Sequence, residues 1–450
     1  MYLPGEEHLH NATLRENVFM RRHESGVPVY FCSKSGFQKR YACFATHFGS
    51  IDNSFQRAGD PRIDVPDGLA HFLEHKLFEG EDRNAFDKFS QNGASSNAYT
   101  SFEVTNYLFS CSRDFFANLR ILIDFVQSPY FTDENVEKEK GIIGQEIRMY
   151  EDSPGWRAFF NLLEALYSAH PIRKDIAGSV ESISHITKKM LYDCYHIFYH
   201  PENMILFGIG DEAPEEFFEC VDSSLTVPTK ALGSIQRFFP DEPKQVAETR
   251  REQVMEISMP RLLMGFKDQD LGYRGRELLA KDLTSDILLE ILFGRASEFF
   301  QKWYSENLID ESFSASYTGT VTVGHSMLGG ETPNPEKVAT VVLEELERAQ
   351  HSGISAADFQ RQKRATMGRF FQEFNSLEFI ANHFCAYKFV GIELFDLIDV
   401  LNGIQQQDLE RRLREHLTPD AVAVSVLQPK SPAGSPGGMS HGGVSAGGVS

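Results

Sequence analysis

Three segments of this chain recur in the same order, at a nearly constant offset, further along the sequence. The paired segments are 70–78 and 286–294, 96–112 and 314–330, and 137–151 and 360–374. Each match alone is weak, but three matches in order indicate an internal duplication in which both copies share one structural plan. A chain of 450 residues also exceeds what one hydrophobic core usually organises. We therefore expect two tandem homologous domains.

Composition gives the expected boundaries of these domains. Residues 221–248 are rich in Pro, Ser and charged side chains, which is typical of a linker. Residues 429–450 form a low-complexity tail of Gly and Ser that cannot bury a core, so we expect this tail to be disordered. We expect the rest of the chain to form an N-terminal domain over residues 1–220 and a C-terminal homologous domain over residues 249–428.

Charge and cysteine usage restrict the partners and the compartment. The formal net charge is −20 at pH 7. Because nucleic acids and anionic membranes attract a basic face, we expect neither as a partner. The six cysteines have no CxxC spacing, which favours buried thiols in a reducing compartment. There is no secretory signal and no apolar run of membrane-spanning length, so we expect a cytoplasmic protein.

Two stretches of the first half show the alternation of polar and apolar residues that is typical of strands. Residues 27–33, the turn at residues 34–36 and the alternating residues 41–47 predict a β-hairpin. Residues 94–112 alternate throughout and predict one long strand.

The motif GLAHFLEHKLFEG, residues 68–80, carries the candidate chemistry. We expect a short helix here, with Asp67 as its N-cap. His71 and His75 are one turn apart on the same side of this helix, so both imidazoles can reach one zinc ion. Glu74 lies beside that position and could act as a general base. The alternative is an ordinary amphipathic helix whose polar residues face outside.

A catalytic zinc ion usually has a third protein ligand. Glu139 and Glu146 are two helical turns apart in EKEKGIIGQEIRMYE, residues 137–151. Either carboxylate could reach the histidines from a neighbouring antiparallel helix. Acidic residues on one helix face are, however, commonly just solvated.

The second copy of the duplication lacks these polar residues. Ile287 and Ile291 align with the two histidines, and Arg369 aligns with Glu146. The duplicated fold therefore does not need the polar cluster for its packing, which favours a functional role for the cluster in the first half.

Together these segments resemble the insulinase/pitrilysin family of zinc peptidases, the inverzincins, and especially its mitochondrial-processing-peptidase-like branch. The resemblance covers nearly the whole chain and rests on five segments, GLAHFLEHKLFEG, GASSNAYTSFEVTNYLF, VEKEKGIIGQEIRMYEDSP, HPIRKDIAGSVESI and FYHPENMILFGIGD. It implies an α+β protein with two tandem α/β sandwich domains of the processing-peptidase type. It also implies an endopeptidase that cleaves unfolded peptides, or leader and precursor peptides.

The resemblance assigns roles around one zinc ion per chain. His71, His75 and Glu146 would bind the zinc ion, and Glu74 would be the general base. Glu139 would orient a ligand and is the fallback for the third ligand.

The resemblance also implies how a peptide substrate is held. The segment SSNAYT matches the edge strand on which the family binds a peptide as an added strand. Asn97 and Ala98 would then contact the substrate. On the residues alone, a plain sheet strand explains this segment equally well.

One departure from the family pattern concerns residues 294–317. Self-sufficient members carry an Arg and a Tyr here that reach the substrate near the zinc ion. At the equivalent positions this chain has residues 307–309, Asn-Leu-Ile, and Phe313. We therefore expect a heterodimer in which a homologous, metal-free partner subunit supplies the Arg/Tyr pair.

Two other functions stay open on the sequence. The chain could be a non-catalytic structural or binding subunit of the same fold in a larger complex, although such subunits usually lose the ligand or base residues. It could also be a metal-dependent hydrolase of another bond, which the strand-binding segment argues against.

Overall fold

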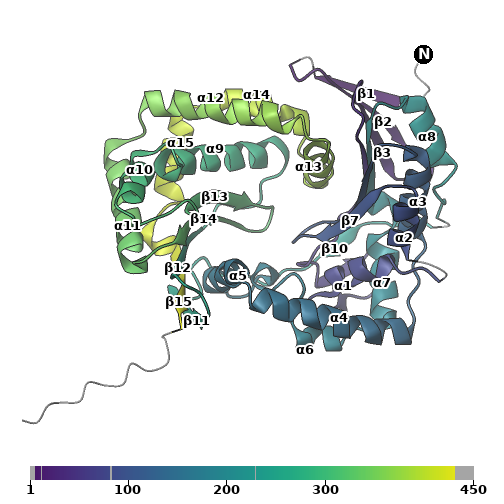
Figure 1. The fold of residues 1–450 in the computed structure, drawn as a ribbon, viewed down its shortest axis with the longest axis horizontal. Helices are drawn as coiled ribbons and strands as arrows, with labels where there is room; N and C mark the ends of the chain where they lie inside the picture. Colours follow the sequence, from purple (N-terminus) through teal and green to yellow (C-terminus); the bar gives the residue numbers. More distant parts are fainter. Residues whose placement is uncertain (1–5, 12, 82–83, 229, 431–450) are drawn as a thin grey trace, which may run out of the picture.

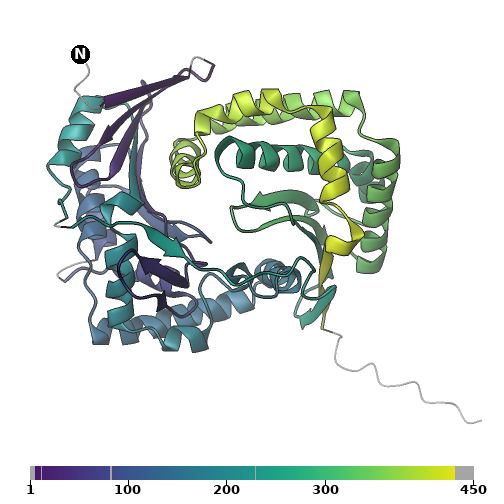
Figure 2. The ribbon, with the colours of Figure 1, turned by 180° about the vertical axis from the view of Figure 1, so that it is seen from behind.

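The structure, a computed structural model, describes residues 6–11, 13–81, 84–228 and 230–430 and has two halves, each built on one β-sheet (Figures 1 and 2). In spatial order, the first sheet contains β1 (Glu6–Asn11), β2 (Glu16–Arg22), β3 (Pro28–Ser33), β9 (Met204–Gly210), β4 (Arg40–Thr46), β8 (Thr105–Cys111) and β7 (Ser95–Thr100). The second sheet contains β11 (Arg250–Met255), β15 (Val422–Pro429), β12 (Arg261–Lys267), β14 (Gly324–Glu331) and β13 (Ser314–Gly319). Most of the expected disordered tail, residues 431–450, lies outside the described residues.

The two sheets have the same topology. The order β3-β9-β4-β8-β7 in the first sheet corresponds to β11-β15-β12-β14-β13 in the second. In each set of five, the first two strands are parallel and the other neighbours are antiparallel. This common order confirms two tandem homologous α/β units.

The expected hairpin of residues 27–47 is wrong. Both of its strands form, as β3 and β4, but β9 lies between them and pairs with each. Every residue of β9 is buried, and a strand buried on both faces is stabilised by a neighbour on each side.

The expectation of one long strand over residues 94–112 is also wrong. The segment folds back on itself as the hairpin β7–β8. The turn is closed by a backbone hydrogen bond from Ser101 N to Val104 O at 2.8 Å and by the Ser101 hydroxyl. Residues 101–104 contain no Gly or Pro, the residues that usually mark a turn. The alternating pattern therefore predicted one strand where the chain forms two.

Helices cover both sheets (Figure 1). Those of the first half are α1 (Leu69–Leu77), α2 (Ala85–Gln91), α3 (Phe115–Gln127), α4 (Asp133–Glu151), α5 (Pro154–Leu166), α6 (Val180–Ser184), α7 (Lys188–Phe198) and α8 (Pro214–Asp222). Those of the second half are α9 (Gly275–Phe293), α10 (Glu298–Ser305), α11 (Pro335–Ser352), α12 (Ala356–Glu373), α13 (Leu377–Phe389), α14 (Leu397–Gly403) and α15 (Gln406–Glu415). None of the helices formed by the described residues is long and apolar enough to span a membrane.

Each half lends one helix to the sheet of the other half. α5 packs on β12 and β15, where the missing side chain of Gly265 leaves room for Leu162 and Leu166. α13 packs on β4 and β9, and the Phe384 ring lies 4.7 Å from that of Tyr30 and 4.8 Å from that of Phe207. One hydrophobic core therefore runs from the first sheet into the second half.

The expected linker, residues 221–248, is partly structured. It contains β10 (Ile235–Arg237), which pairs with β5 (Ser54–Arg57), and β5 pairs in turn with β6 (Ile63–Asp64). All six cysteines are free and buried, as expected.

Candidate metal centre

The amphipathic pattern of α1 determines which way its polar residues point. Leu69, Phe72, Leu73 and Leu77 are buried in the core of the first half. The opposite side of α1 packs against α4 and β7. The structure brings His71, Glu74 and His75 together with side chains from these two elements.

The start of α1 depends on Gly68, and the expectation that Asp67 is the N-cap is wrong. Gly68 is the N-cap residue, with a φ of 88°. A Cβ atom there would lie 2.4 Å from the carbonyl oxygen of Ala177, so only glycine fits. The Asp67 carboxylate instead accepts a hydrogen bond from Asn53 at 2.7 Å.

The second element of the site is α4. A capping box between Thr132 and Asn135 begins this helix. Both candidate carboxylates, Glu139 and Glu146, face the histidines of α1.

Three side chains converge on one point between α1 and α4. His71 Nε2 lies 3.7 Å from Glu146 Oε1, and His75 Nε2 lies 3.4 Å from Glu146 Oε2. One ligand atom from each of these three residues lies within 4.8 Å of the other two. Two imidazoles and one carboxylate are a donor set that suits Zn²⁺. His71 Nδ1 is buried without a hydrogen-bond partner among the described residues, and Nε2 is the ring nitrogen that faces Glu146.

The two histidines have different electrostatic environments. Burial, with a smaller contribution from His75, lowers the pKa of His71 to about 3. Burial alone would also lower the pKa of His75, but its hydrogen bond to Glu139 and the nearby carboxylates outweigh burial and raise it above 6.5. His75 Nδ1 lies 3.1 Å from Glu139 Oε1. Glu139 therefore contacts the far side of the His75 ring, while Glu146 faces the side where the three donors meet.

Glu74 is not one of the three converging residues. Its Oε2 accepts a hydrogen bond from the Thr100 hydroxyl on β7 at 2.6 Å. Burial raises the pKa of Glu74 even though this hydrogen bond opposes the shift. A carboxyl group with a raised pKa is better suited to exchange protons near neutral pH.

Two residues of the site were not expected from the sequence. Thr100 is one, because its contact with Glu74 links two elements that are far apart in the sequence. Tyr150 is the other, and its hydroxyl donates to Glu146 Oε1 at 2.8 Å. Tyr150 is four residues after Glu146, so the i, i+4 rule for helices could have indicated this contact.

The strand β7 forms one edge of the first sheet, on the side that faces the second half (Figure 1). Among the described strands it pairs only with β8, so its outer edge is open. Asn97 is exposed on this strand and Ala98 is half-buried. α1 lies beside β7, and Thr100 at the end of the strand contacts Glu74.

The second half has an ion pair in place of part of the polar cluster of the first half. Arg369 on α12 lies 3.8 Å from Glu290 on α9. These positions align with Glu146 and Glu74. Ile287, aligned with His71, is buried in the core.

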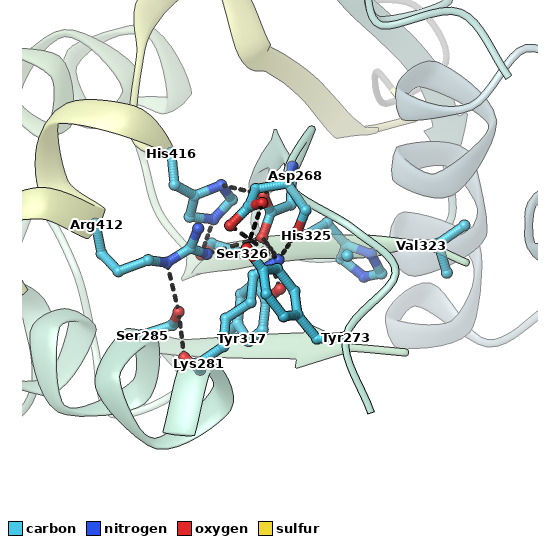
Figure 3. A network of polar contacts seen from close by, with 12 residues as sticks. Asp268, Tyr273, Lys281, Ser285, Tyr317, Val323, His325, Ser326, Arg412 and His416 are labelled. Carbon is cyan, nitrogen blue, oxygen red and sulfur yellow. Dashed lines mark hydrogen bonds and ion pairs between the residues drawn. The ribbon is translucent and has the colours of Figure 1, made fainter. Parts of the chain in front are cut away.

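Figure 3 shows a separate polar network in the second half, centred on Asp268. The buried carboxylate of Asp268 accepts from the Tyr317 hydroxyl at 2.7 Å, from Arg412 at 2.8 Å and from Lys281 at 2.9 Å. These contacts join the end of β12 to α9, β13 and α15. Tyr317, Arg412 and Lys281 are therefore all engaged within the second half.

Family comparisons agree with this division of roles. The family model described as Insulinase (Peptidase family M16) matches residues 62–180, and the one described as Peptidase M16 inactive domain matches residues 185–366. The Bacillus subtilis protein named Uncharacterized zinc protease YmfH is 43% identical over 420 residues, which cover 93% of this chain and 98% of that protein. The chain belongs to the insulinase family, peptidase family M16.

Other relatives support the same membership. The crystal structure of an M16-like peptidase from Alicyclobacillus acidocaldarius is 37% identical, with a TM-score of 0.89, and covers 96% of this chain and all of that one. An Arabidopsis thaliana protein named as a mitochondrial-processing peptidase subunit beta is 26% identical over 186 residues, 40% of this chain and 35% of its own length. The resemblance to this zinc peptidase family is thus confirmed, and the relatives named zinc proteases indicate that the chain is a protease.

Proposed function

We propose that this chain is a zinc-dependent endopeptidase that cleaves unfolded peptides or leader and precursor peptides in the cytoplasm. One observation carries the proposal: His71, His75 and Glu146 converge from two helices, with the buried carboxylate of Glu74 beside them. The second half keeps the fold without this set, so packing alone does not explain the set. Family membership supports hydrolysis of peptide bonds as the reaction.

Three side chains would hold one zinc ion per chain, His71, His75 and Glu146. The ion would supply Lewis-acid activation of the scissile carbonyl and of the attacking water. His71 is held neutral by burial, which suits a ligand. Glu139 and Tyr150 fix the orientation of two of the ligands through hydrogen bonds.

Glu74 would move the proton in this reaction. The Thr100 hydroxyl occupies Oε2 of Glu74, so Oε1 is the oxygen that takes the proton from the attacking water. The same carboxyl group then delivers the proton to the leaving amine. Its raised pKa makes the carboxylate a stronger base for taking up the proton and brings its proton exchange closer to neutral pH.

The open edge of β7 would bind the peptide substrate. A peptide added as a strand is held by main-chain hydrogen bonds, which read extended conformation rather than sequence. Asn97 and Ala98 would lie beside the bound peptide. Folded proteins cannot offer such an extended segment, so unfolded peptides are the expected substrates.

We also propose a partner subunit of the same fold that lacks a metal and supplies an Arg/Tyr pair. Residues 306–313 of this chain contain neither Arg nor Tyr. Tyr304, the nearest Tyr before this segment, stacks on Phe300 and is 43% exposed. The nearest Arg before the segment and the nearest Tyr after it are engaged within the second half. Arg295 donates to the carbonyl of Glu311, and the Tyr317 hydroxyl donates to buried Asp268. Purification of a homodimer with full peptidase activity would contradict this part of the proposal.

The variant Glu74→Gln tests the proposal while conserving shape. Zinc affinity should stay within about threefold of wild type, because Glu74 is not a ligand, and turnover of an internally quenched peptide should fall by about 10²–10⁴-fold. Isothermal titration with zinc and fluorescence kinetics measure the two quantities. Equal turnover by wild type and variant would instead favour a non-catalytic subunit or a different catalytic group.

A further inference from the structure

The residue after His75 is a lysine with no exposed surface. Lys76 is 0% exposed in α1. Its ammonium group forms an ion pair with Glu79 and lies 3.6 Å from Glu139 Oε2. Lysine is almost never fully buried without a partner, because its charge loses the hydration of water. Both of its partners are carboxylates close to the candidate metal centre.

The two oxygens of Glu139 are divided between two neighbours. Oε1 contacts His75 Nδ1 at 3.1 Å, and Oε2 faces the Lys76 ammonium group. Glu139 is only 4% exposed, so water cannot replace these contacts. A carboxylate accepts hydrogen bonds and cannot donate them, which leaves the proton on Nδ1 and the lone pair of His75 on Nε2. That atom is the one that faces Glu146.

We propose that Lys76 is a positioning residue for the metal centre: it holds Glu139 in place, and Glu139 presents Nε2 of His75 to the zinc ion. This inference rests on the proposed function, because it takes His75 as a zinc ligand. Lys76 does not touch the metal or the substrate and acts only through Glu139. Glu79 helps to neutralise the ammonium group and has no contact with the histidines among the described residues.

The other explanation of Lys76 is that it only stabilises the fold. Lys281 provides a matched control, because it is also a buried lysine on the corresponding helix of the second half and is paired with a buried carboxylate, Asp268, at 2.9 Å. Lys281→Met removes a buried ion pair of the same kind far from the metal donors. It should lower the melting temperature and leave zinc affinity unchanged.

A double-mutant cycle on zinc affinity separates the two explanations. The dissociation constant for zinc, measured by competition with a chromophoric chelator, should rise about tenfold in Lys76→Met and in Lys76→Gln, as is typical when a group that orients a ligand is lost. Glu139→Ala should weaken zinc binding by about 10–100-fold. Lys76→Met in the Glu139→Ala background should then add less than about twofold, because the route from Lys76 to His75 is already cut. Glu79→Gln should change zinc affinity by less than about threefold.

Each result decides between the explanations. Additive effects of Lys76→Met and Glu139→Ala, or an unchanged zinc affinity in Lys76→Met, would overturn the inference. Loss of the fold in both Lys76 variants, seen by circular dichroism, would assign the lysine to packing and overturn it as well. If wild-type protein itself binds no zinc, the proposed function fails first, so the two failures are distinguishable.

Discussion

At the scale of single residues, the candidate metal centre combines two histidines with different surroundings. Nδ1 of His71 has no hydrogen-bond partner among the described residues, while Nδ1 of His75 contacts Glu139. Burial, with a smaller contribution from His75, holds the pKa of His71 low, while His75 is oriented by Glu139. These residues and Glu74 could be predicted from sequence because the spacing of a helix brings them together. The contact of Thr100 with Glu74 and that of Lys76 with Glu139 could not, because they depend on how α1 meets β7 and α4 in space.

Zinc binding should depend on pH through His75. A metal ligand must lose its proton, and the pKa of His75 is raised above 6.5, so protons compete with zinc already above that pH. The dissociation constant for zinc should therefore rise by up to about tenfold for each pH unit below the pKa of His75. His71, with a pKa of about 3, should not add to this pH dependence. Zinc titrations between pH 8 and 5.5 measure this. Affinity that does not change over this range would contradict the assignment of His75 as a ligand.

At the scale of elements, the site is the meeting point of two helices and an edge strand. Helices in residues 68–80 and 137–151 were expected from the sequence, and α1 and α4 form there. The hairpin β7–β8 and the insertion of β9 between β3 and β4 were not expected, because strand pairing is decided by tertiary packing and not by local alternation. The consequence is functional, since the hairpin puts the free edge of β7 beside α1.

The start of α1 gives a stability test at this scale. Gly68→Ala would force a side chain into a left-handed φ and against the Ala177 carbonyl, so the free energy of unfolding should fall by about 1–3 kcal/mol. Gly141→Ala is the control, because Gly141 is an exposed position of α4 with open space around its Cα atom. This change should stabilise the protein by up to about 1 kcal/mol. Thermal melts of both variants check the signs, and equal melting temperatures would refute the account of Gly68.

At the scale of the whole molecule, the duplication and the exchange of helices make the two halves interdependent. The duplication was evident in the sequence, because three segments recur in order. The exchange was not, because the sequence of a helix shows which residues it can bury but not which of two sheets it will cover. The predicted domain boundaries therefore separate the two copies of the duplicated sequence, whereas the hydrophobic core extends across both halves. They stay predictions.

Separation of the halves tests this interdependence. Residues 1–248 alone would expose the face of β4 and β9 that α13 covers, including the contact of Cys43 with Cys385 at 3.7 Å. We expect this fragment to aggregate when expressed alone and to become soluble on co-expression with residues 249–430. Size-exclusion chromatography of the single and co-expressed fragments measures this. A monodisperse, folded fragment of residues 1–248 would show that α13 is dispensable.

The central claim is that the first half is a working peptidase centre, and digestion of a mixed peptide pool tests it most directly. One sample contains zinc-loaded protein and the peptide pool, and a second sample also contains the proteins that co-purify with it from the source organism. The products of both samples are identified by mass spectrometry. Cleavage at internal peptide bonds that is lost with a chelator and with Glu74→Gln is the predicted result, and cleavage that requires a co-purifying homologue would support the partner subunit as well. Absence of any chelator-sensitive cleavage in both samples would contradict the account and leave a zinc-binding scaffold.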